Sequence, residues 1–484
     1  MFNFFNKPTI SHANLRWALL LIFPAVCAPV VVHFGPTPEV VISCVVAMMS
    51  CVYLLCQLNT ITSRNLTVWL VLCVFFFLYF LRYVYFSFDP TPVKGTHPDT
   101  AYKLLHDDSA ALQRSFVFSS IVFAIFCVGS ALLLKRTANK DLYAASSTGP
   151  RRVVDGQSTR ILLFGIPALM FLLGYVAYKY QIGQMGVDPG EPLPFRLKGL
   201  VFYARLIVLP LLILTLIYLG KIATNSWVVR AGLFLLLAHG ISDMMLRGSR
   251  SILLLCILLT IFLAASGGMR LKRNGILIGS ALLLAAVSLM PVVMKYRILR
   301  FTSNEDPITV LGHAMRATGE SLPQLLLNGL SVLYYRIPGI ETMWAILSVK
   351  AEPLGSALIP TLISPFGITG YLTFTAYQVP PESNTLFAPG FVGWLYLAGG
   401  MIGLVLGALV LAWVCVIVPR LIYGAGLQCA PVANTFLLWI LFVSMTDGTL
   451  DSNLYIIAAG LISLCGIELS LFMFSKKNAA EVPG

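Results

Sequence analysis

The chain has 484 residues, of which 58% are hydrophobic and only 11% are charged. Soluble domains carry about 25% charged residues, so the composition excludes an ordinary soluble protein and indicates an integral membrane protein. The formal net charge of +13 does not indicate a nucleic-acid partner, because the cytoplasmic loops of membrane proteins are enriched in Lys and Arg.

Hydropathy predicts an all-α, polytopic membrane protein with a single membrane domain and about twelve membrane-spanning helices. Residues 16–294 contain nine of these spans and residues 391–474 contain three. The first apolar run follows Lys7 and Arg16 but is broken by Pro24 and Pro29, so we expect an uncleaved span and not a signal peptide. The predicted spans are 16–34, 38–57, 66–86, 115–134, 161–180, 200–220, 228–246, 251–266, 276–294, 391–418, 432–447 and 454–474.

The basic loops predict the orientation. The 135–160 loop and the 267–275 loop are rich in Lys and Arg, and Arg420, Lys476 and Lys477 follow later spans. All of these places fall on one side if the N-terminus is cytoplasmic. We therefore expect both termini inside and the 87–114, 181–199 and 295–389 segments outside. The basic 267–275 loop also favours a hairpin of spans seven and eight over one long helix.

The segment 295–389 is not an ordinary span. Its apolar runs are interrupted by prolines, and none reaches the roughly 20 apolar residues that a spanning helix needs. We expect a partly amphipathic, partly re-entrant block that lies on, or dips into, the outer membrane face. Its charges balance: Lys295, Arg297, Arg300, Arg316, Arg336 and Lys350 against Glu305, Asp306, Glu320, Glu341, Glu352 and Glu382.

Arginines on the predicted outer side are candidates for binding a pyrophosphate and its glycan. The planar guanidinium matches phosphate oxygens, and a spacing of three places two side chains on one helical face. The alternative is structural, because Asp243 stands four residues before Arg247 and acids of the block can pair with its arginines. The candidates are Arg247, Arg250, Arg297, Arg300, Arg316 and Arg336.

Two further arginines, Arg82 and Arg205, lie within predicted spans. An intramembrane charge usually faces a cavity or a charged partner, although a long side chain near a helix end can instead extend to the interface. His239 is either a ligand or a contact within the bundle, with Asp243 as its candidate partner.

An enzyme that transfers a group to a hydroxyl needs a residue that activates this hydroxyl. His313 and Glu341 are the candidate catalytic residues on the outer side, and His313 shares its segment with Arg316 and Glu320. Asp447 and Asp451 are further candidates on the outer side. The alternative for both is a structural role, because Asp is an ordinary turn former. No Asp-x-Asp occurs on the outer side and no Cys/His metal spacing occurs, so we expect no metal and no cofactor.

Three stretches together resemble the Wzy family of O-antigen polymerases. LRGSRSILLL (246–255) resembles the Gly-Ser-Arg signature that opens a span, and YYRIPGIETMWAI (334–346) resembles the Arg–x–x–Gly–x–Glu stretch of the large periplasmic loop. SNTLFAPGFVGWLYLAGGMIGLVLG (383–407) resembles the following loop-to-span passage. It departs from many relatives at Ala398, Gly399 and Gly400, where they have Asn–Phe–Gly.

The resemblance implies a GT-C-like glycosyltransferase of the bacterial inner membrane. Such enzymes join undecaprenyl-pyrophosphate-linked oligosaccharide units at the periplasmic face, with the lipid pyrophosphate as leaving group. It supports Arg250, Arg336 and Glu341 among the site residues, and it implies a Wzz-like chain-length-regulating partner. The other hypotheses are an O-antigen ligase, which shares this topology, and a flippase of lipid-linked sugars. Flippases tend to show related halves, and we find none.

Overall fold

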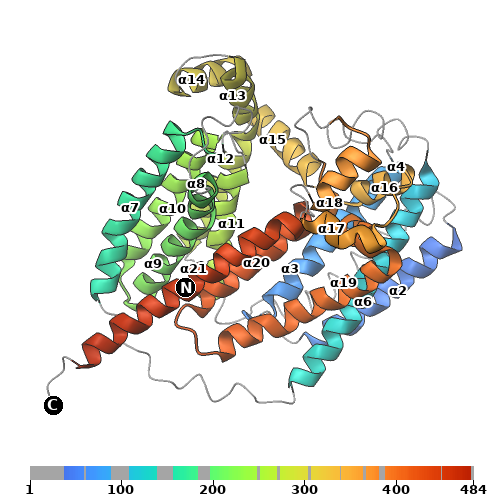
Figure 1. The fold of residues 1–484 in the computed structure, drawn as a ribbon, viewed down its shortest axis with the longest axis horizontal. Helices are drawn as coiled ribbons and strands as arrows, with labels where there is room; N and C mark the ends of the chain where they lie inside the picture. Colours follow the sequence, from blue (N-terminus) through green and yellow to red (C-terminus); the bar gives the residue numbers. More distant parts are fainter. Residues whose placement is uncertain are drawn as a thin grey trace. The chain divides into compact units, whose positions relative to one another are not determined.

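The computed structural model describes residues 37–58, 62–88, 108–138, 156–183, 197–247, 251–269, 273–302, 307–337, 339–363, 367–380, 387–447 and 450–480. Every regular element in these ranges is helical (Figure 1). Nine helices among the described residues are long and apolar enough to cross a membrane. The described residues are therefore all-helical, as predicted, and their nine long apolar helices are those of a multi-pass membrane protein by length and composition.

Nine of the twelve predicted spans coincide with these long helices. They are Pro38–Gln57, Leu66–Phe88, Ser109–Thr137, Thr159–Lys179, Leu197–Ile222, Ser226–Arg247, Gly279–Leu299, Gly390–Gly424 and Asn453–Met473. Two more, 251–266 and 432–447, match shorter apolar helices, Ile252–Ala265 and Ala430–Thr446. The first, 16–34, lies outside the described residues, so the count of twelve stays a prediction.

The outer surface of the helices is apolar. Phe171 in Thr159–Lys179 is 79% exposed, and Phe164 in the same helix is 75% exposed. Monomeric soluble proteins rarely expose contiguous apolar surface on this scale, whereas lipid tails solvate it well. Backbone groups cannot bond to water in that environment, which is why the spans are helices with internally satisfied hydrogen bonds.

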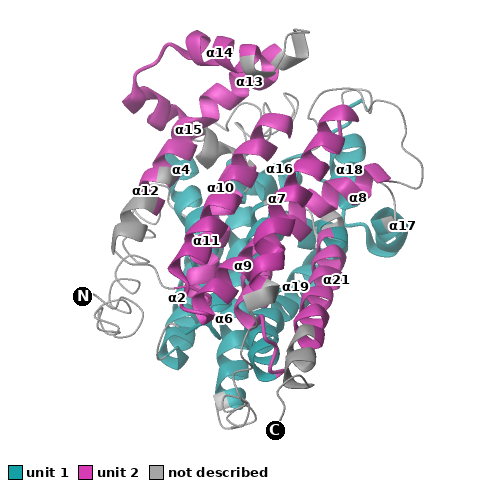
Figure 2. Cartoon of the chain, turned by 90° about the vertical axis from the view of Figure 1, so that its left-hand side faces the viewer, with its two compact units in different colours: residues 1–145, 335–424, 440–455 teal, residues 146–334, 425–439, 456–484 magenta. Residues whose placement is uncertain are grey.

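The chain forms two compact units, coloured separately in Figure 2. Unit 1 comprises residues 1–145, 335–424 and 440–455. Unit 2 comprises residues 146–334, 425–439 and 456–484. Two helices, α20 (Ala430–Asp447) and α21 (Leu450–Ala480), each contribute residues to both units.

Unit 1 is built around the long helix α6 (Ser109–Ala138), which packs against α2, α16 and α19. Small residues allow close approach, and a Cβ at Gly129 of α6 would lie 3.2 Å from the Cβ of Ala412 in α19. The other elements of this unit are α2 (Pro38–Gln57), α3 (Leu66–Phe75), η1 (Phe76–Phe80), α4 (Leu81–Phe88), α16 (Ile340–Ser348), η5 (Gly355–Ala357), α17 (Leu358–Ile363), α18 (Gly367–Gly370), η6 (Tyr371–Ala376) and α19 (Gly390–Gly424).

Helix α19 is broken at its first third. Gly399 and Gly400 have non-helical backbone angles, and Gly400 has φ +59° and ψ −140°. Pro353 packs against this break, and the amide of Leu354 donates to the carbonyl of Leu397 at 2.8 Å. The break falls within the stretch 383–407.

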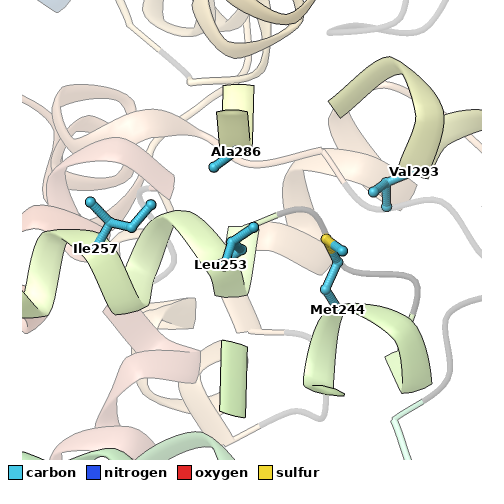
Figure 3. Close-up of a cluster of buried hydrophobic side chains, with 5 residues drawn as sticks. All are labelled: Met244, Leu253, Ile257, Ala286 and Val293. Atoms are coloured by element: carbon cyan, nitrogen blue, oxygen red, sulfur yellow. The ribbon is translucent and has the colours of Figure 1, made fainter. Parts of the chain in front are cut away.

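Unit 2 is a bundle of α7, α9, α10 and α11, with α12 packed against α11. Helices α10 and α11 form the expected hairpin: Gly240 lies against Cys256, and Met244 joins Leu253 in one cluster (Figure 3). The elements are α7 (Gly156–Lys179), α8 (Leu197–Tyr203), η4 (Ala204–Val208), α9 (Leu209–Ile222), α10 (Ser226–Arg247), α11 (Ser251–Ala265), α12 (Arg273–Ser288), α13 (Met290–Thr302), α14 (Pro307–Thr318) and α15 (Leu322–Arg336).

The predicted block 295–389 consists of short helices, as its prolines suggest. The pair Gly355–Leu362 and Gly367–Ala376 bends by 112°, which is the geometry of a broken span or a re-entrant loop. The helix that contains the predicted span 276–294 continues to Leu299, and α13 runs on to Thr302. Lys295 and Arg297 thus stand on the end of a span and not in a loop.

Candidate functional site

Three ion pairs of the described residues form two buried clusters, one in each unit. Both lie in apolar surroundings, where an unpaired charge is costly. Of the two alternatives for the intramembrane arginines, the charged partner is the one observed. Arg82 and Arg205 pair with carboxylates and do not extend to the interface.

In unit 1, Arg82 pairs with Glu341. The Arg82 guanidinium Nη1 donates to Glu341 Oε1 and also to the carbonyl of Ile337 at 2.5 Å. The backbone amide of Gly339 donates to the same carboxylate oxygen at 3.1 Å. The side chains of Arg82 and Glu341 are 1% and 4% exposed, so the pair is removed from solvent.

Local sequence explains why Glu341 reaches this position. Gly339 precedes α16 and lies so close to the Leu78 carbonyl that a Cβ could not fit without a shift. Thr342 Oγ1 donates back to the Gly339 carbonyl at 2.7 Å, which fixes the entry into the helix. The Gly–x–Glu of the Wzy-like stretch thus has a packing role in this chain.

One oxygen of Glu341 has no hydrogen-bond partner. Oε2 is buried and accepts nothing, while Oε1 carries all the contacts described above. Nearby, Trp344 is almost fully buried and its indole Nε1 donates to the Asp108 carbonyl at 2.8 Å, which ties α16 to the start of α6. The carboxylate is rigidly held and retains one unused acceptor.

In unit 2, Asp243 on α10 binds two arginines. Its Oδ1 pairs with Arg205, and its Oδ2 accepts from Arg247 Nη1 at 3.3 Å. Asp243 is 0% exposed. The Arg247 guanidinium also stacks over the ring of Phe202, 4.4 Å from its centroid. His239, one turn before Asp243, is buried.

This cluster carries excess positive charge. Two guanidinium groups share the one carboxylate of Asp243, so the sum is +2 − 1 = +1 with His239 neutral. Arg205 Nη1 and Arg247 Nε are buried and have no hydrogen-bond partner. Buried donors and an uncompensated charge are both unfavourable, and an oxyanion bound between the arginines would satisfy both. The Arg82–Glu341 pair, by contrast, is balanced one to one.

Both buried arginines are associated with π-helical turns. Arg205 lies within η4, and Arg82 follows η1 by two residues. π-helical turns are rare and are frequent at functional sites. In both places the turn redirects a charged side chain of a span toward its carboxylate.

Three of the sequence-predicted residues lie on helices at the start of the block. His313 and Arg316 are exposed on one face of α14, and Arg316 Nε donates to its own helix at the Gly312 carbonyl, 3.3 Å away. Arg297 is half-buried on α13. Glu320 accepts from Asn328 Nδ2 at 2.7 Å.

Other predicted residues cannot be placed in a site. Arg250 lies outside the described residues. Arg300 and Arg336 belong to α13 and α15, but their side chains are outside the description. Of the predicted set, Arg247 is brought into a buried charged cluster in unit 2, and Glu341 into one in unit 1.

The sequence pattern missed two partners. Arg205 is separated from Asp243 by 38 positions and Arg82 from Glu341 by 259, so no local spacing connects them. The available signal was the position of both arginines inside apolar spans, which predicts a partner without naming it. Asp243–Arg247, at i and i+4, was readable as an ion pair and is one.

Within the described residues, no group of three or more His, Cys, Asp or Glu side chains is arranged to hold a metal ion. What these residues offer is a cationic site in unit 2 and a fixed carboxylate in unit 1. The sequence matches no protein-family model, and no curated protein and no solved structure shows significant similarity to the chain.

Proposed function

We propose that the chain is a membrane glycosyltransferase that polymerises undecaprenyl-pyrophosphate-linked oligosaccharide repeat units at the periplasmic face of the inner membrane. The observation that carries the proposal is the Arg205–Asp243–Arg247 cluster, with its excess positive charge and its unused guanidinium donors. A lipid-linked pyrophosphate brings an anionic group to such a site while its polyprenyl tail remains among lipids.

The geometry of the cluster is suited to stabilising the negative charge of a leaving pyrophosphate. Asp243 holds both guanidinium groups in place, which leaves their remaining N–H groups oriented before substrate arrives. Donors fixed in advance stabilise charge as it develops in the transition state. Arg247 ends α10, and Arg250 follows three residues later in the Gly-Ser-Arg stretch, so the proposal includes Arg250 as a further phosphate ligand.

The reaction transfers the growing glycan to a new unit. The bond between the anomeric carbon and a pyrophosphate oxygen breaks, and the acceptor sugar oxygen bonds to that carbon. The acceptor proton passes to a base, for which Glu341 and His313 are the proposed residues. Glu341 is supported by its unpartnered Oε2, and His313 by its exposed position beside Arg316 on α14.

Replacement of the buried arginines tests the proposal. Arg205→Lys and Arg247→Lys keep the charge that pairs with Asp243 but lose the forked donor geometry. Loss of one such donor costs about 10²-fold or more in rate. We expect each variant, reconstituted in liposomes with lipid-linked repeat units, to lose the ladder of long products while remaining inserted. Arg230→Lys, at an exposed position on the same helix α10, is the matched control.

Each outcome bears on the proposal. A normal ladder from Arg247→Lys would overturn the phosphate role of the cluster. In the unmodified protein, transfer of glycan to a lipid A core acceptor without polymerisation would identify a ligase. Movement of the lipid-linked units across the bilayer without any new glycosidic bond would identify a flippase.

A further inference from the structure

Helices α14 and α15 pack against the membrane-spanning helix that precedes them. Val310 and Ala314 of α14 form one apolar cluster with Val292 and Tyr296, which belong to the last turns of the span Gly279–Leu299. Leu325 of α15 packs on the same cluster. The two helices therefore pack near the end of this span, beside α13 (Figure 2).

Helix α15 also contacts the span at greater depth. Gly329 lies directly against the backbone of Val287, so close that no Cβ could be added there without a shift of backbone. Val287 is eight residues before Lys295, the first charged residue at this end of the span, which corresponds to about 12 Å at 1.5 Å per helical residue. The hydrocarbon core of a bilayer is about 30 Å thick and the headgroup regions add roughly 5–8 Å on each side, so Gly329 lies near the boundary between headgroups and acyl chains, the depth at which an amphipathic helix presents one face to each.

The outward surface of α15 is divided into two arcs. Successive residues differ by about 100° around a helix, which places Leu322, Leu330 and Leu327 on one arc. Leu322 is 70% exposed and Leu327 is 63% exposed. The neighbouring arc is polar and consists of Gln324, Asn328 and Ser331, which are also exposed.

Helix α14 repeats this division. Met315 is 57% exposed, whereas Thr309, His313 and Arg316 form an exposed polar arc. An exposed apolar arc beside a polar arc, with basic residues at its edge, is typical of helices that lie in the membrane interface.

We propose that the apolar arcs of α14 and α15, Met315 with Leu322, Leu327 and Leu330, are buried in lipid, and that the polar arcs face headgroups and water. The occupant is the bilayer and not a partner protein, because the helix against which both pack, Gly279–Leu299, is itself long and apolar enough to cross a membrane. The inference does not depend on the reaction that the chain catalyses.

The test compares adjacent residues at the same depth. An environment-sensitive fluorescent amino acid is incorporated at Leu327 in one variant and at Asn328 in another, and each full-length protein is placed in nanodiscs. We expect brominated acyl chains to quench the probe at 327 and aqueous iodide to quench the probe at 328. The probe at 327 should also emit at the shorter wavelength. The Leu330 and Ser331 pair repeats the comparison one turn later.

Two results would overturn the inference. If iodide quenches both members of each pair equally, α15 stands in water. If neither quencher reaches 327 or 330, and if shielding falls as the protein is diluted among nanodiscs, then a second copy of the chain covers the arc.

Discussion

At the scale of single residues, the Arg82–Glu341 pair is the most constrained interaction of unit 1. A buried pair contributes little net stability, because desolvation offsets the attraction. Removal of one partner is different, since it leaves the other charge buried and uncompensated. The pair is therefore a sensitive test of whether Glu341 is structural or catalytic.

We expect Arg82→Met to destabilise the folded protein by about 3–5 kcal/mol, the typical cost of breaking a buried pair on one side. The double variant Arg82→Met/Glu341→Met should recover much of this loss, because neither charge remains. Thermal unfolding in detergent micelles measures both. Lys350→Met, at an exposed position, is the control, and an Arg82→Met protein as stable as that control would contradict the prediction.

Glu341→Gln separates the two roles of the carboxylate. Gln retains the shape and can still accept from Arg82 and Gly339, but it cannot take a proton. If Glu341 is the base, polymerisation falls sharply in a variant that still accumulates in the membrane, and the loss exceeds any change in thermal stability. Activity that follows stability alone would assign Glu341 a structural role.

These residues show which side-chain contacts can be predicted from the sequence and which cannot. Asp243 and Arg247 are four apart, so helix geometry alone predicts their contact. Glu341 and Arg82 come from segments far apart in the sequence, which meet where α16 packs on η1 and Gly339 closely approaches Leu78. Long-range packing of this kind leaves no periodic trace in the sequence, so Arg82 could be recognised as needing a partner but not matched to one.

At the scale of elements, the break in α19 depends on one glycine. Gly400 has positive φ with ψ −140°, close to a region that is essentially restricted to glycine and costs of order 1–3 kcal/mol for other residues. Gly399 has φ −160° and open space around it. We expect Gly400→Ala to lower thermal stability and Gly399→Ala to have little effect, measured in the same detergent. Equal behaviour of the two variants would mean that the break does not need this backbone conformation.

Most elements were predictable because membrane insertion is decided locally. A run of about 20 apolar residues must become a helix wherever it crosses lipid, and nine of the predicted spans are long helices. The helix of the predicted span 276–294 continues beyond Met294, since the charged residues Lys295 and Arg297 also belong to α13. Charge marks where a span leaves the apolar region, whereas the end of the helix is set by backbone hydrogen bonding.

At the scale of the whole molecule, the orientation of the chain is the prediction on which the outer site rests. A reporter fused after Ala145 should read cytoplasmic, because the 135–160 loop is strongly basic. A reporter fused after Val310 should read periplasmic. Paired phosphatase and fluorescent-protein fusions measure both. Reporters on the same side would contradict the topology and the periplasmic reaction site with it.

Activity should persist in a chelator. We expect this because the sequence has no Asp-x-Asp on its predicted outer side and no Cys/His spacing typical of metal ligands. The assay uses purified protein, lipid-linked repeat units and excess EDTA. Loss of product that magnesium or manganese restores would contradict the expectation and direct attention to the 87–114 loop, where His97, Asp99, His106, Asp107 and Asp108 are found.

The π-helical turns at Arg82 and Arg205 make the charged centres depend on chain length as well as on residue identity. A π-helical turn closes its hydrogen bond over five residues instead of four, so it holds one more residue than the α-helical turn it replaces. Deletion of one residue within Ala204–Val208 would let the span close into a regular α-helix and would rotate one half against the other by about 100°. Arg205 would then be present in the sequence but directed away from Asp243. Deletion of one residue would therefore break the Arg205–Asp243 pair while the span stays as apolar as before. A scan of substitutions alone would not detect this dependence on helix length.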